Sequence, residues 1–550
     1  MRHFEEVGSA SASSIAANVS VASTVREDVG SERTVPASTD QPGYGKWGDQ
    51  RDGSYVNPVL PGDFSDLDAI RVGQDFYAIT STMQYSPGMA ILHSRDLVNW
   101  RIAGHVVSDI SALDPALNWD KMNRAGRGIW AGSIRYHDGR FWVYFGTPDQ
   151  GIFMSSSTSA SGKWTAPKLV LGEPGWDDPC PFWDDDGQGY LVVTHFAPEG
   201  VRKTPYTIHL FKLTRKNDAI LPAFDHVIHH SEGSEANKLY KINGLYYHFF
   251  SEVRREGRVP MMERSPTLNG PWENHLVMHV HGASDGEPNQ GGMVELSNGQ
   301  WYFLSHQGRG DWEGRAGVLL PVTWIAGWPI PGIAGEDKAG TMVWSGEKPI
   351  EGFPPTDLVA SGSFDTAVLK PEWEWNYQPR RQMWSLIAHP GSIRMFAFPP
   401  LKPGDFHTIG NILTQRSLRT LENEVVVRLD LAGMADGQQA GLAHYARHYC
   451  SIQVDQEGSG RSLLYEENGV RIPGPILNRD SIYLRSRWDI AGRNTFSYSD
   501  NGQDWNSIGP SCNLTWGDYR GDRIGIFTTN QMATAGYIDV DSFQYHVHHE

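Results

Sequence analysis

The sequence predicts an all-β protein: a five-bladed β-propeller followed by a β-sandwich of the jelly-roll or concanavalin-like type. An aromatic strand pattern recurs along the first 350 residues, and no long stretch keeps the 3.6-residue period of an amphipathic helix. The 550 residues include 59 Gly, 20 Trp, 21 Tyr and 21 Phe. Many short strands joined by glycine turns have this composition.

The repeated unit is an aromatic-aliphatic strand behind a turn. It occurs as "VGQDFYAITS", "HDGRFWVYFG", "DDGQGYLVVTH", "INGLYYHFFSE" and "SNGQWYFLSHQ". Its aromatic positions follow one another at intervals of 65, 49, 56 and 55 residues: Phe76, Phe141, Tyr190, Tyr246 and Trp301. Four-stranded propeller blades need about 40–50 residues, so five repeats predict five blades. The alternative is a series of β-sandwiches with similar hairpins.

The chain divides into four parts. Residues 1–45 are rich in Ser, Ala, Val and Thr without a period, which predicts a disordered leader. The propeller is expected over 46–345, and the Pro and Gly density of 346–362 is typical of a linker. Strands such as "NEVVVRLDLAGM" and "SIYLRSRWDI" predict the sandwich over 363–550.

Charge and hydropathy limit the partners. With 64 acidic and 47 basic residues the formal charge is -17, which argues against nucleic acid and suits a neutral ligand such as a sugar. No run approaches the roughly 18 apolar residues of a membrane span. Glu5 and Glu6 stand where a signal peptide would be apolar, so a cytoplasmic location is expected. The sequence carries no indication of oligomeric state.

The three cysteines, Cys180, Cys450 and Cys512, show neither a disulfide framework nor zinc-ligand spacing. They are expected to be separate buried thiols.

Three carboxylates precede the predicted inner strands of different blades, where a propeller brings side chains to one mouth of its axis. They are Asp66 in "SDLDAIRVG", Asp178 in "GWDDPCPFW" and Glu235 in "GSEANKLY". A turn or capping role is the alternative for Asp66, and Glu232 competes with Glu235. Glycosidic cleavage needs one acid and one further carboxylate, about 5 Å apart in retaining enzymes and about 6.5–9.5 Å apart in inverting ones. The residues alone do not say which carboxylate takes which role.

Several motifs resemble glycoside hydrolase family 43, the β-xylosidases and α-L-arabinofuranosidases. They include "NPVLPG", "GIWAGSIRYHDGRFWVYF", "DPCPFWDDDGQGYLV", "EANKLYKINGLYY" and "GGMVELSNGQWYFL", and they span about residues 50–350. The part after residue 363, with "WEWNYQP", "GLAHY" and "GYIDVDSF", resembles the concanavalin-like sandwich of one branch of that family.

The resemblance implies roles for the three acids. Asp66 corresponds to the general base, Asp178 to the aspartate that modulates the pKa of the acid, and Glu235 to the general acid of an inverting, single-displacement reaction. Arg315, in "EGRAGVLLPV", corresponds to an arginine that points at the sugar hydroxyls. An ion pair with Glu313 is the alternative for this arginine.

Other positions of the pocket follow from the same resemblance. Trp130 and Phe64 correspond to aromatic residues near the subsite of the terminal sugar; a place in the core is the alternative for both. Leu67 and Gly132 stand where the family motifs have proline.

No cofactor is expected for the chemistry, but the resemblance allows a structural calcium. Gln290, where some members have an axial histidine, and His306 are the candidate ligands on the axis. Asp365 and Asp541 are candidates in the sandwich, with turn aspartates as the alternative.

The sequence therefore predicts an exo-acting inverting glycosidase that releases terminal β-D-xylose, with α-L-arabinofuranose as a second sugar, from xylo-oligosaccharides and arabinoxylan fragments. The alternatives are an enzyme acting mainly as an α-L-arabinofuranosidase and a non-catalytic carbohydrate-binding propeller.

Overall fold

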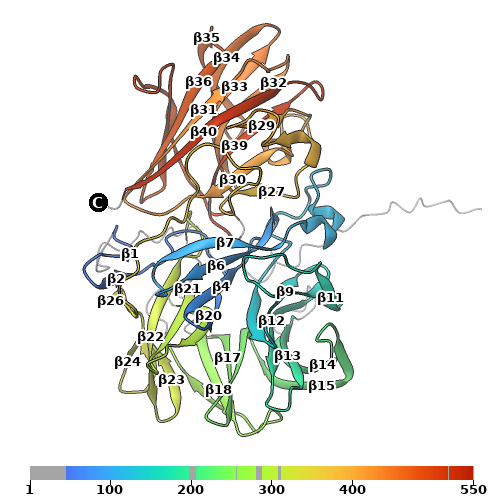
Figure 1. The fold of residues 1–550 in the computed structure, drawn as a ribbon, viewed down its shortest axis with the longest axis vertical. Coiled ribbons are helices and arrows are strands. Elements are labelled where there is room, and N and C mark those ends of the chain that lie inside the picture. The colour runs from blue at the N-terminus through green and yellow to red at the C-terminus, as the bar shows by residue number, and fades with distance from the viewer. Residues whose placement is uncertain are drawn as a thin grey trace, which may run out of the picture.

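Strands make up almost all the regular structure of the protein, as the computed structural model shows (Figure 1). The structure describes residues 45–196, 206–255, 257–279, 288–307, 311–517 and 519–548. The helices in this part are single 3-10 turns: η1 (Ile110–Ala112), η2 (Pro115–Leu117), η3 (Arg381–Met383) and η4 (Phe406–Thr408). The all-β prediction is confirmed. The predicted leader lies outside the described residues except for Gly45.

Five antiparallel four-stranded sheets form the lower body in Figure 1, counted over the described residues. From inner to outer strand, the first sheet is β3 (Asp68–Val72), β4 (Asp75–Thr80), β6 (Gly88–Ser94) and β7 (Trp100–Val107), and the second is β8 (Gly132–His137), β9 (Arg140–Thr147), β10 (Gly151–Ser157) and β11 (Lys168–Leu171). The third is β12 (Trp176–Trp183), β13 (Gly189–His195), β14 (Tyr206–Leu213) and β15 (Ile220–Ser231). The fourth is β16 (Glu235–Ile242), β17 (Leu245–Arg254), β18 (Gly257–Ser265) and β19 (Glu273–Leu276), and the fifth is β20 (Pro288–Glu295), β21 (Trp301–Gln307), β22 (Gly317–Ile325) and β23 (Trp328–Pro331). The first strands of successive sheets contact one another, and β20 contacts β3, so the inner strands form a closed ring.

The aromatic repeat read from the sequence is the second strand of each sheet, since its five positions fall in β4, β9, β13, β17 and β21. The hairpin turns before it explain the Asp-Gly and Asn-Gly pairs. In the second sheet both turn residues have positive φ, Asp138 at 49° and Gly139 at 71°. Two-residue turns of this kind match the right-handed twist of the strands.

One half-buried side chain, Arg135 of β8, links the inner strands around the axis. It bonds Asp68 of the first sheet at 2.7 Å and the Cys180 sulfur of the third at 3.0 Å. Its guanidinium also lies 5.6 Å from the ring of Tyr240 in the fourth sheet. The Tyr240 hydroxyl in turn accepts the backbone N–H of Met293 in the fifth sheet at 3.0 Å. Polar contacts therefore join all five inner strands.

The upper body in Figure 1 is a sandwich of two antiparallel sheets. One sheet runs β35 (Val470–Leu477), β34 (Gly460–Glu467), β33 (Tyr449–Glu457), β32 (Gln438–Tyr445), β39 (Arg523–Asn530), β30 (Ile412–Arg416), β27 (Glu374–Asn376) and β5 (Tyr85–Ser86). The other runs β28 (Trp384–Ser385), β29 (Ile393–Phe396), β40 (Tyr537–His548), β31 (Glu422–Asp430), β36 (Ser481–Asp489), β37 (Arg493–Ser499) and β38 (Asn506–Asn513).

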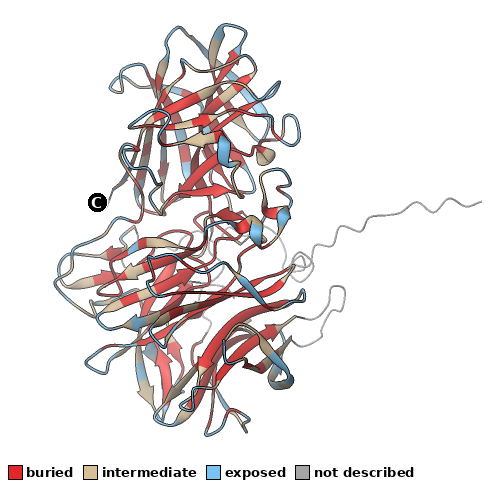
Figure 2. Ribbon diagram, turned by 45° about the vertical axis from the view of Figure 1, so that its right-hand side comes forward, coloured by how far each residue is buried: buried red, intermediate tan, exposed pale blue. Residues whose placement is uncertain are grey.

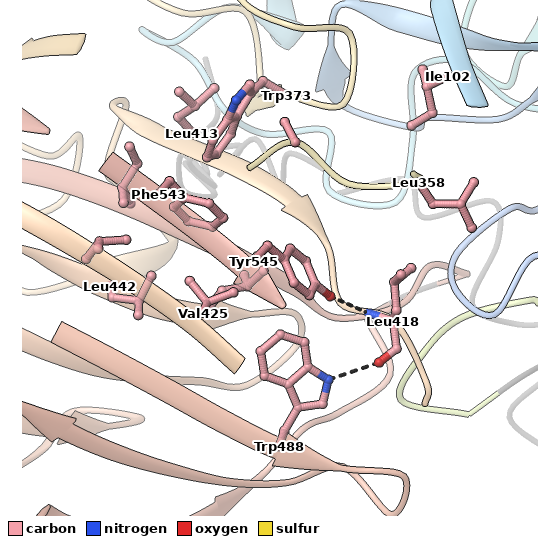
Figure 3. Packing of buried hydrophobic residues seen from close by; sticks show 14 of the residues in the cluster. Ile102, Leu358, Trp373, Leu413, Leu418, Val425, Leu442, Trp488, Phe543 and Tyr545 are labelled. Carbon is pink, nitrogen blue, oxygen red and sulfur yellow. Dashed lines mark hydrogen bonds between the residues drawn. The ribbon is translucent and has the colours of Figure 1, made fainter. Parts of the chain in front are cut away.

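The propeller and the sandwich share a core. Strand β5 leaves the first blade and pairs with β27 as the last strand of a sandwich sheet. Buried residues are continuous through the junction (Figure 2), where one apolar cluster includes Ile102 of β7 and Trp488 of β36 (Figure 3). In this cluster the backbone of Leu418 accepts from the Trp488 indole at 3.0 Å and donates to the Tyr545 hydroxyl at 2.9 Å.

Short sheets complete the propeller. Strand β26 (Ser345–Glu347) pairs with β2 (Ser54–Val56), which ties the end of the domain to its beginning. The remaining short strands are β1 (Gly48–Asp49), β24 (Ile333–Ala334) and β25 (Gly340–Thr341). No helix in the described ranges is long and apolar enough to cross a membrane.

The prediction of three separate thiols is wrong for two of them. Cys450 of β33 and Cys512 of β38 form a disulfide across the two sandwich sheets, while Cys180 stays a free, buried thiol. The two partners are 62 residues apart in the sequence. Sheet packing brings them together, and their spacing carries no signal of it.

Candidate active site

The three predicted carboxylates lie at the beginnings of inner strands, each beside a backbone irregularity. Asp66, just before β3, has φ 56° and Asp178 in β12 has φ 50°. Glu235 opens β16 and is followed by Ala236 at φ 71°. Positive φ is uncommon outside glycine and concentrates at functional sites. At all three positions the backbone departs from regular strand geometry.

The Asp66 carboxylate is almost completely buried and fully engaged. Arg315 reaches both of its oxygens, at 2.8 Å and 3.0 Å, and the Ser81 hydroxyl donates to Oδ2 at 2.6 Å. The backbone N–H of Asp66 donates to Nδ1 of His306 at 2.8 Å. Burial alone would raise the pKa of Asp66, but Arg315, His306 and Ser81 together hold it below its ordinary value. Asp66 is therefore ionised at neutral pH.

Asp178 has the opposite electrostatic environment. Gln290 donates to its Oδ1 at 2.6 Å, and the backbone N–H of Ala236 donates to Oδ2 at 2.7 Å. Burial and the negative charge of Glu235 raise the pKa of Asp178 to about 6, against the opposing charge of Lys238. The Asp178 carboxyl therefore takes up a proton in a range where an ordinary aspartate stays charged.

Glu235 is the most accessible of the three, with 23% of its side chain exposed. Its Oε1 lies 3.2 Å from the guanidinium of Arg258. Arg258 is itself fixed by the backbone oxygen of Gly233 at 2.7 Å and the hydroxyl of Ser251 at 3.1 Å. An accessible carboxyl at the mouth can reach a bound molecule without rearrangement.

The three carboxylates belong to one site. Both Glu235 and Asp66 act on the titration of Asp178, although they come from the fourth and first blades. A fourth carboxyl, Asp177, lies in the same field and was missed by the sequence analysis. The only signal for it was the Asp-Asp pair before Pro179, of which the second aspartate directly precedes the proline.

The predicted sugar-binding residues differ in their surroundings. Arg315 pairs with Asp66, whereas Glu313 pairs with Arg419 at 2.8 Å, so the alternative Arg315–Glu313 pair is not formed. Trp130 is half-buried, and its indole N–H donates to the backbone of Gly126 at 3.0 Å. Phe64 is completely buried, with the Arg416 guanidinium 4.9 Å from its ring. Phe64 therefore packs behind Asp66 and offers no surface to a sugar in this structure.

Comparison with known proteins assigns both domains to families. The family model described as Glycosyl hydrolases family 43 matches residues 55–329, and the model described as Beta xylosidase C-terminal Concanavalin A-like domain matches residues 361–546. The chain belongs to glycoside hydrolase family 43.

Individual relatives match over most or nearly all of the chain. A Beta-xylosidase of Formosa agariphila is 30% identical over 546 residues, which cover 91% of this chain and 92% of that protein. The Non-reducing end alpha-L-arabinofuranosidase BoGH43B of Bacteroides ovatus is 29% identical over 373 residues, covering 62% and 65%. The crystal structure of the GH43 BlXynB protein from Bacillus licheniformis superimposes with a TM-score of 0.77 at 25% identity, covering 90% of this chain and 100% of that one.

The axial calcium candidates of this family 43 chain have other partners. The Gln290 amide donates to Asp178, and Nδ1 of His306 accepts from Asp66. Because Nδ1 accepts, Nε2 of His306 carries the ring proton, and it donates to the Asn289 side-chain oxygen at 3.0 Å. Burial, and then Arg315, lower the pKa of His306 to about 3, so the ring is neutral. These side chains position the carboxylates and leave no ring nitrogen for a metal.

The sandwich candidates are also engaged. Asp541 pairs with Arg428 and accepts from Ser392 at 2.8 Å, and Asp365 accepts from the hydroxyl of Ser363. Within the described ranges, no group of three or more His, Cys, Asp or Glu side chains could hold a metal ion. The residues present therefore do not fit a calcium site at either place.

The sandwich contributes to the wall behind Asp66. Arg523 lies 3.4 Å from the Asp63 carboxylate, and Nε of Arg416 donates to the Asp63 backbone oxygen at 2.8 Å. A guanidinium nitrogen of Arg315 also lies 3.5 Å from the backbone oxygen of Tyr519. The family 43 site is thus supported by both domains.

Proposed function

We propose that this glycoside hydrolase is an exo-acting, inverting β-xylosidase that removes terminal β-D-xylose from xylo-oligosaccharides and also accepts terminal α-L-arabinofuranose. The observation that carries the proposal is the set of three carboxylates from three blades in different electrostatic environments. The Beta-xylosidase of Formosa agariphila, which matches over nearly the whole chain, supports the choice of sugar.

In the proposed mechanism Asp66 is the general base. Its ionised carboxylate takes a proton from a water molecule, and the resulting oxygen nucleophile attacks the anomeric carbon. Glu235 gives its proton to the glycosidic oxygen as the bond to the leaving sugar breaks. Asp178, whose own titration responds to both Glu235 and Asp66, orients the sugar. One displacement of this kind inverts the anomeric configuration.

The second candidate is an enzyme acting mainly as an α-L-arabinofuranosidase. The similarity to BoGH43B favours it, and the two sugars present superimposable hydroxyl groups. The ratio of kcat/KM on 4-nitrophenyl β-D-xylopyranoside and 4-nitrophenyl α-L-arabinofuranoside decides between them. A carbohydrate-binding propeller without activity is disfavoured because buried like charges are costly and a binding module has no use for them.

The acid assignment is tested with Glu235→Ala. This variant should lose xylobiose hydrolysis by at least about 10²-fold, the lower end of what general acid catalysis contributes. It should keep part of its rate on 4-nitrophenyl xyloside, whose leaving group needs little protonation. Glu232→Ala is the matched control, because Glu232 is exposed and three residues away. Equal losses on both substrates would remove Glu235 from the role of acid.

The compartment in which the enzyme works stays a prediction. Disulfides persist mainly in oxidising environments, so the Cys450–Cys512 bond argues against the expected cytoplasmic location. We propose an oxidising compartment instead. Thiol alkylation of the protein in fractionated native cells, with and without prior reduction, tests this.

A further inference from the structure

Asp177 is a buried acid that the proposed mechanism does not use. It precedes Asp178 in β12 and is 7% exposed. Its Oδ1 is buried and has no hydrogen-bond partner among the residues that the structure describes. A buried polar oxygen without a partner is uncommon and calls for an explanation.

Comparing the third and fourth blades shows which position of the repeat Asp177 occupies. Strand β12 has a β-bulge between Asp177 and Cys180, and β16 has one between Glu235 and Lys238. In the two sheets Asp177 pairs with Thr194, and Glu235 pairs with Ser251. Asp177 therefore occupies in the third blade the position that Glu235 occupies in the fourth.

The neighbouring blade leaves room for this carboxyl. A Cβ atom on Gly146 of β9 would lie 2.1 Å from Oδ1 of Asp177, so a side chain at this position would displace the carboxyl. The backbone oxygen of Gly146 accepts the N–H of Trp130 at 2.9 Å. The Asp177 side chain thus lies beside Gly146, whose backbone bonds to that of the half-buried Trp130.

Burial and the neighbouring charges determine the protonation state of Asp177. Burial, and then the charges of Asp178, Glu235 and Asp66, raise the pKa of Asp177 well above its ordinary value. The nearby cations serve the other acids, since Lys238 acts on Asp178 and Arg258 pairs with Glu235. A protonated carboxyl has an O–H to donate, and a bound sugar offers hydroxyl oxygens that accept.

We propose that Asp177 is a neutral hydrogen-bond donor of the subsite for the terminal sugar, where its O–H meets a hydroxyl oxygen of that sugar. Asp177 is then a specificity-determining residue beside the three predicted catalytic acids. The proposal rests on the proposed function, because it needs a terminal sugar bound next to Asp178.

The test compares Asp177→Asn with Asp177→Leu, two side chains of similar shape. Asn keeps a donor and Leu removes it, so kcat/KM on the 4-nitrophenyl glycoside should be at least tenfold higher for Asn than for Leu. The wild type is assayed first on the xyloside and the arabinofuranoside. Turnover of neither would refute the proposed function, whereas equal kcat/KM of the two variants in an active background would overturn only the role of Asp177.

Two further readouts separate a donor from a packing residue. On monodeoxy xylosides, the gap between the Asn and Leu variants should fall below about threefold for the analogue that lacks the accepting hydroxyl. A gap that persists on every analogue would overturn the proposal. The limbs of the pH profile of kcat/KM should stay in place for Asp177→Asn, because one neutral group replaces another. An alkaline limb displaced by a full pH unit would mean that Asp177 is charged, and this result decides the matter even if the Leu variant does not fold.

Discussion

Replacing Glu374 by glutamine should weaken the junction between the two domains. Glu374 lies in β27 and is completely buried. Its oxygens accept from Arg416 at 3.1 Å, from Arg523 at 2.7 Å and from His105 of the first blade at 3.0 Å. One carboxylate therefore pairs with two buried guanidinium groups and connects them to the propeller.

The expected magnitude follows from the burial of these partners. Arg416 and Arg523 are 2% and 0% exposed, so the Gln variant leaves a net positive charge buried there, with Asp63 as the remaining carboxylate partner among the described residues. Removing one partner of a buried ion pair typically costs about 3–5 kcal/mol. The free energy of unfolding should fall by this amount at neutral pH.

The buried carboxylate of Glu374 should also make the free energy of unfolding depend on pH. Burial opposes ionisation of Glu374, but Arg416, Arg523 and His105 outweigh it and lower its pKa below the ordinary value. A carboxyl with a lowered folded-state pKa contributes stability above its unfolded pKa of about 4.5, and this is lost as the pH falls toward the folded value. The wild type should therefore lose stability on acidification below about pH 4.5, and the Gln variant should lack this component.

Urea unfolding followed by tryptophan fluorescence measures both effects, with Lys168→Gln as the control. Lys168 forms an exposed ion pair with Asp218 at 2.5 Å, and such pairs contribute less than about 1 kcal/mol. If Glu374→Gln is no more destabilising than this control, or keeps the acid sensitivity of the wild type, the account of the junction is wrong.

Two other predictions concern the framework. Cys512→Ser opens a covalent loop of 62 residues and should lower the free energy of unfolding by about 4 kcal/mol. Reductant should lower the stability of the wild type by the same amount and leave the variant unchanged. An unchanged melting temperature would show that the bond does not form. Arg135→Met leaves the buried Asp68 carboxylate without its cation and should lower the free energy of unfolding, measured by heat or urea, by about 3–5 kcal/mol. A loss below about 1 kcal/mol would contradict the linking role of Arg135 on the axis.

The sequence predicted the features that depend on local pattern. Each aromatic repeat is a strand behind a tight turn, and the Asp-Gly and Asn-Gly pairs determine that turn through backbone preference. Five occurrences were therefore visible without knowledge of any contact. The carboxylates Asp66, Asp178 and Glu235 were found because each precedes a predicted inner strand of a different blade.

Features that depend on contacts between distant segments were not predictable in this way. Arg315 was assigned to the sugar, and its ion pair with Asp66, across 249 residues of sequence, was not foreseen. Phe64 was placed in the pocket, but Arg416 of the sandwich covers its ring. The Cys450–Cys512 bond and the role of Asp177 were overlooked for the same reason, because both depend on contacts between different sheets.

These contacts make the sandwich a structural part of the catalytic centre. Asp66 can act as a base only if its positive-φ backbone and its carboxylate are both held in place. Two residues just before it in the chain, Asp63 and Phe64, contact Arg416 of the sandwich, and Asp63 also contacts Arg523. Since Glu374 in turn orients both arginines, the position of the proposed base depends on a buried charge in the other domain. Such a dependence explains why two buried arginines are kept at a junction where apolar side chains would pack at lower cost.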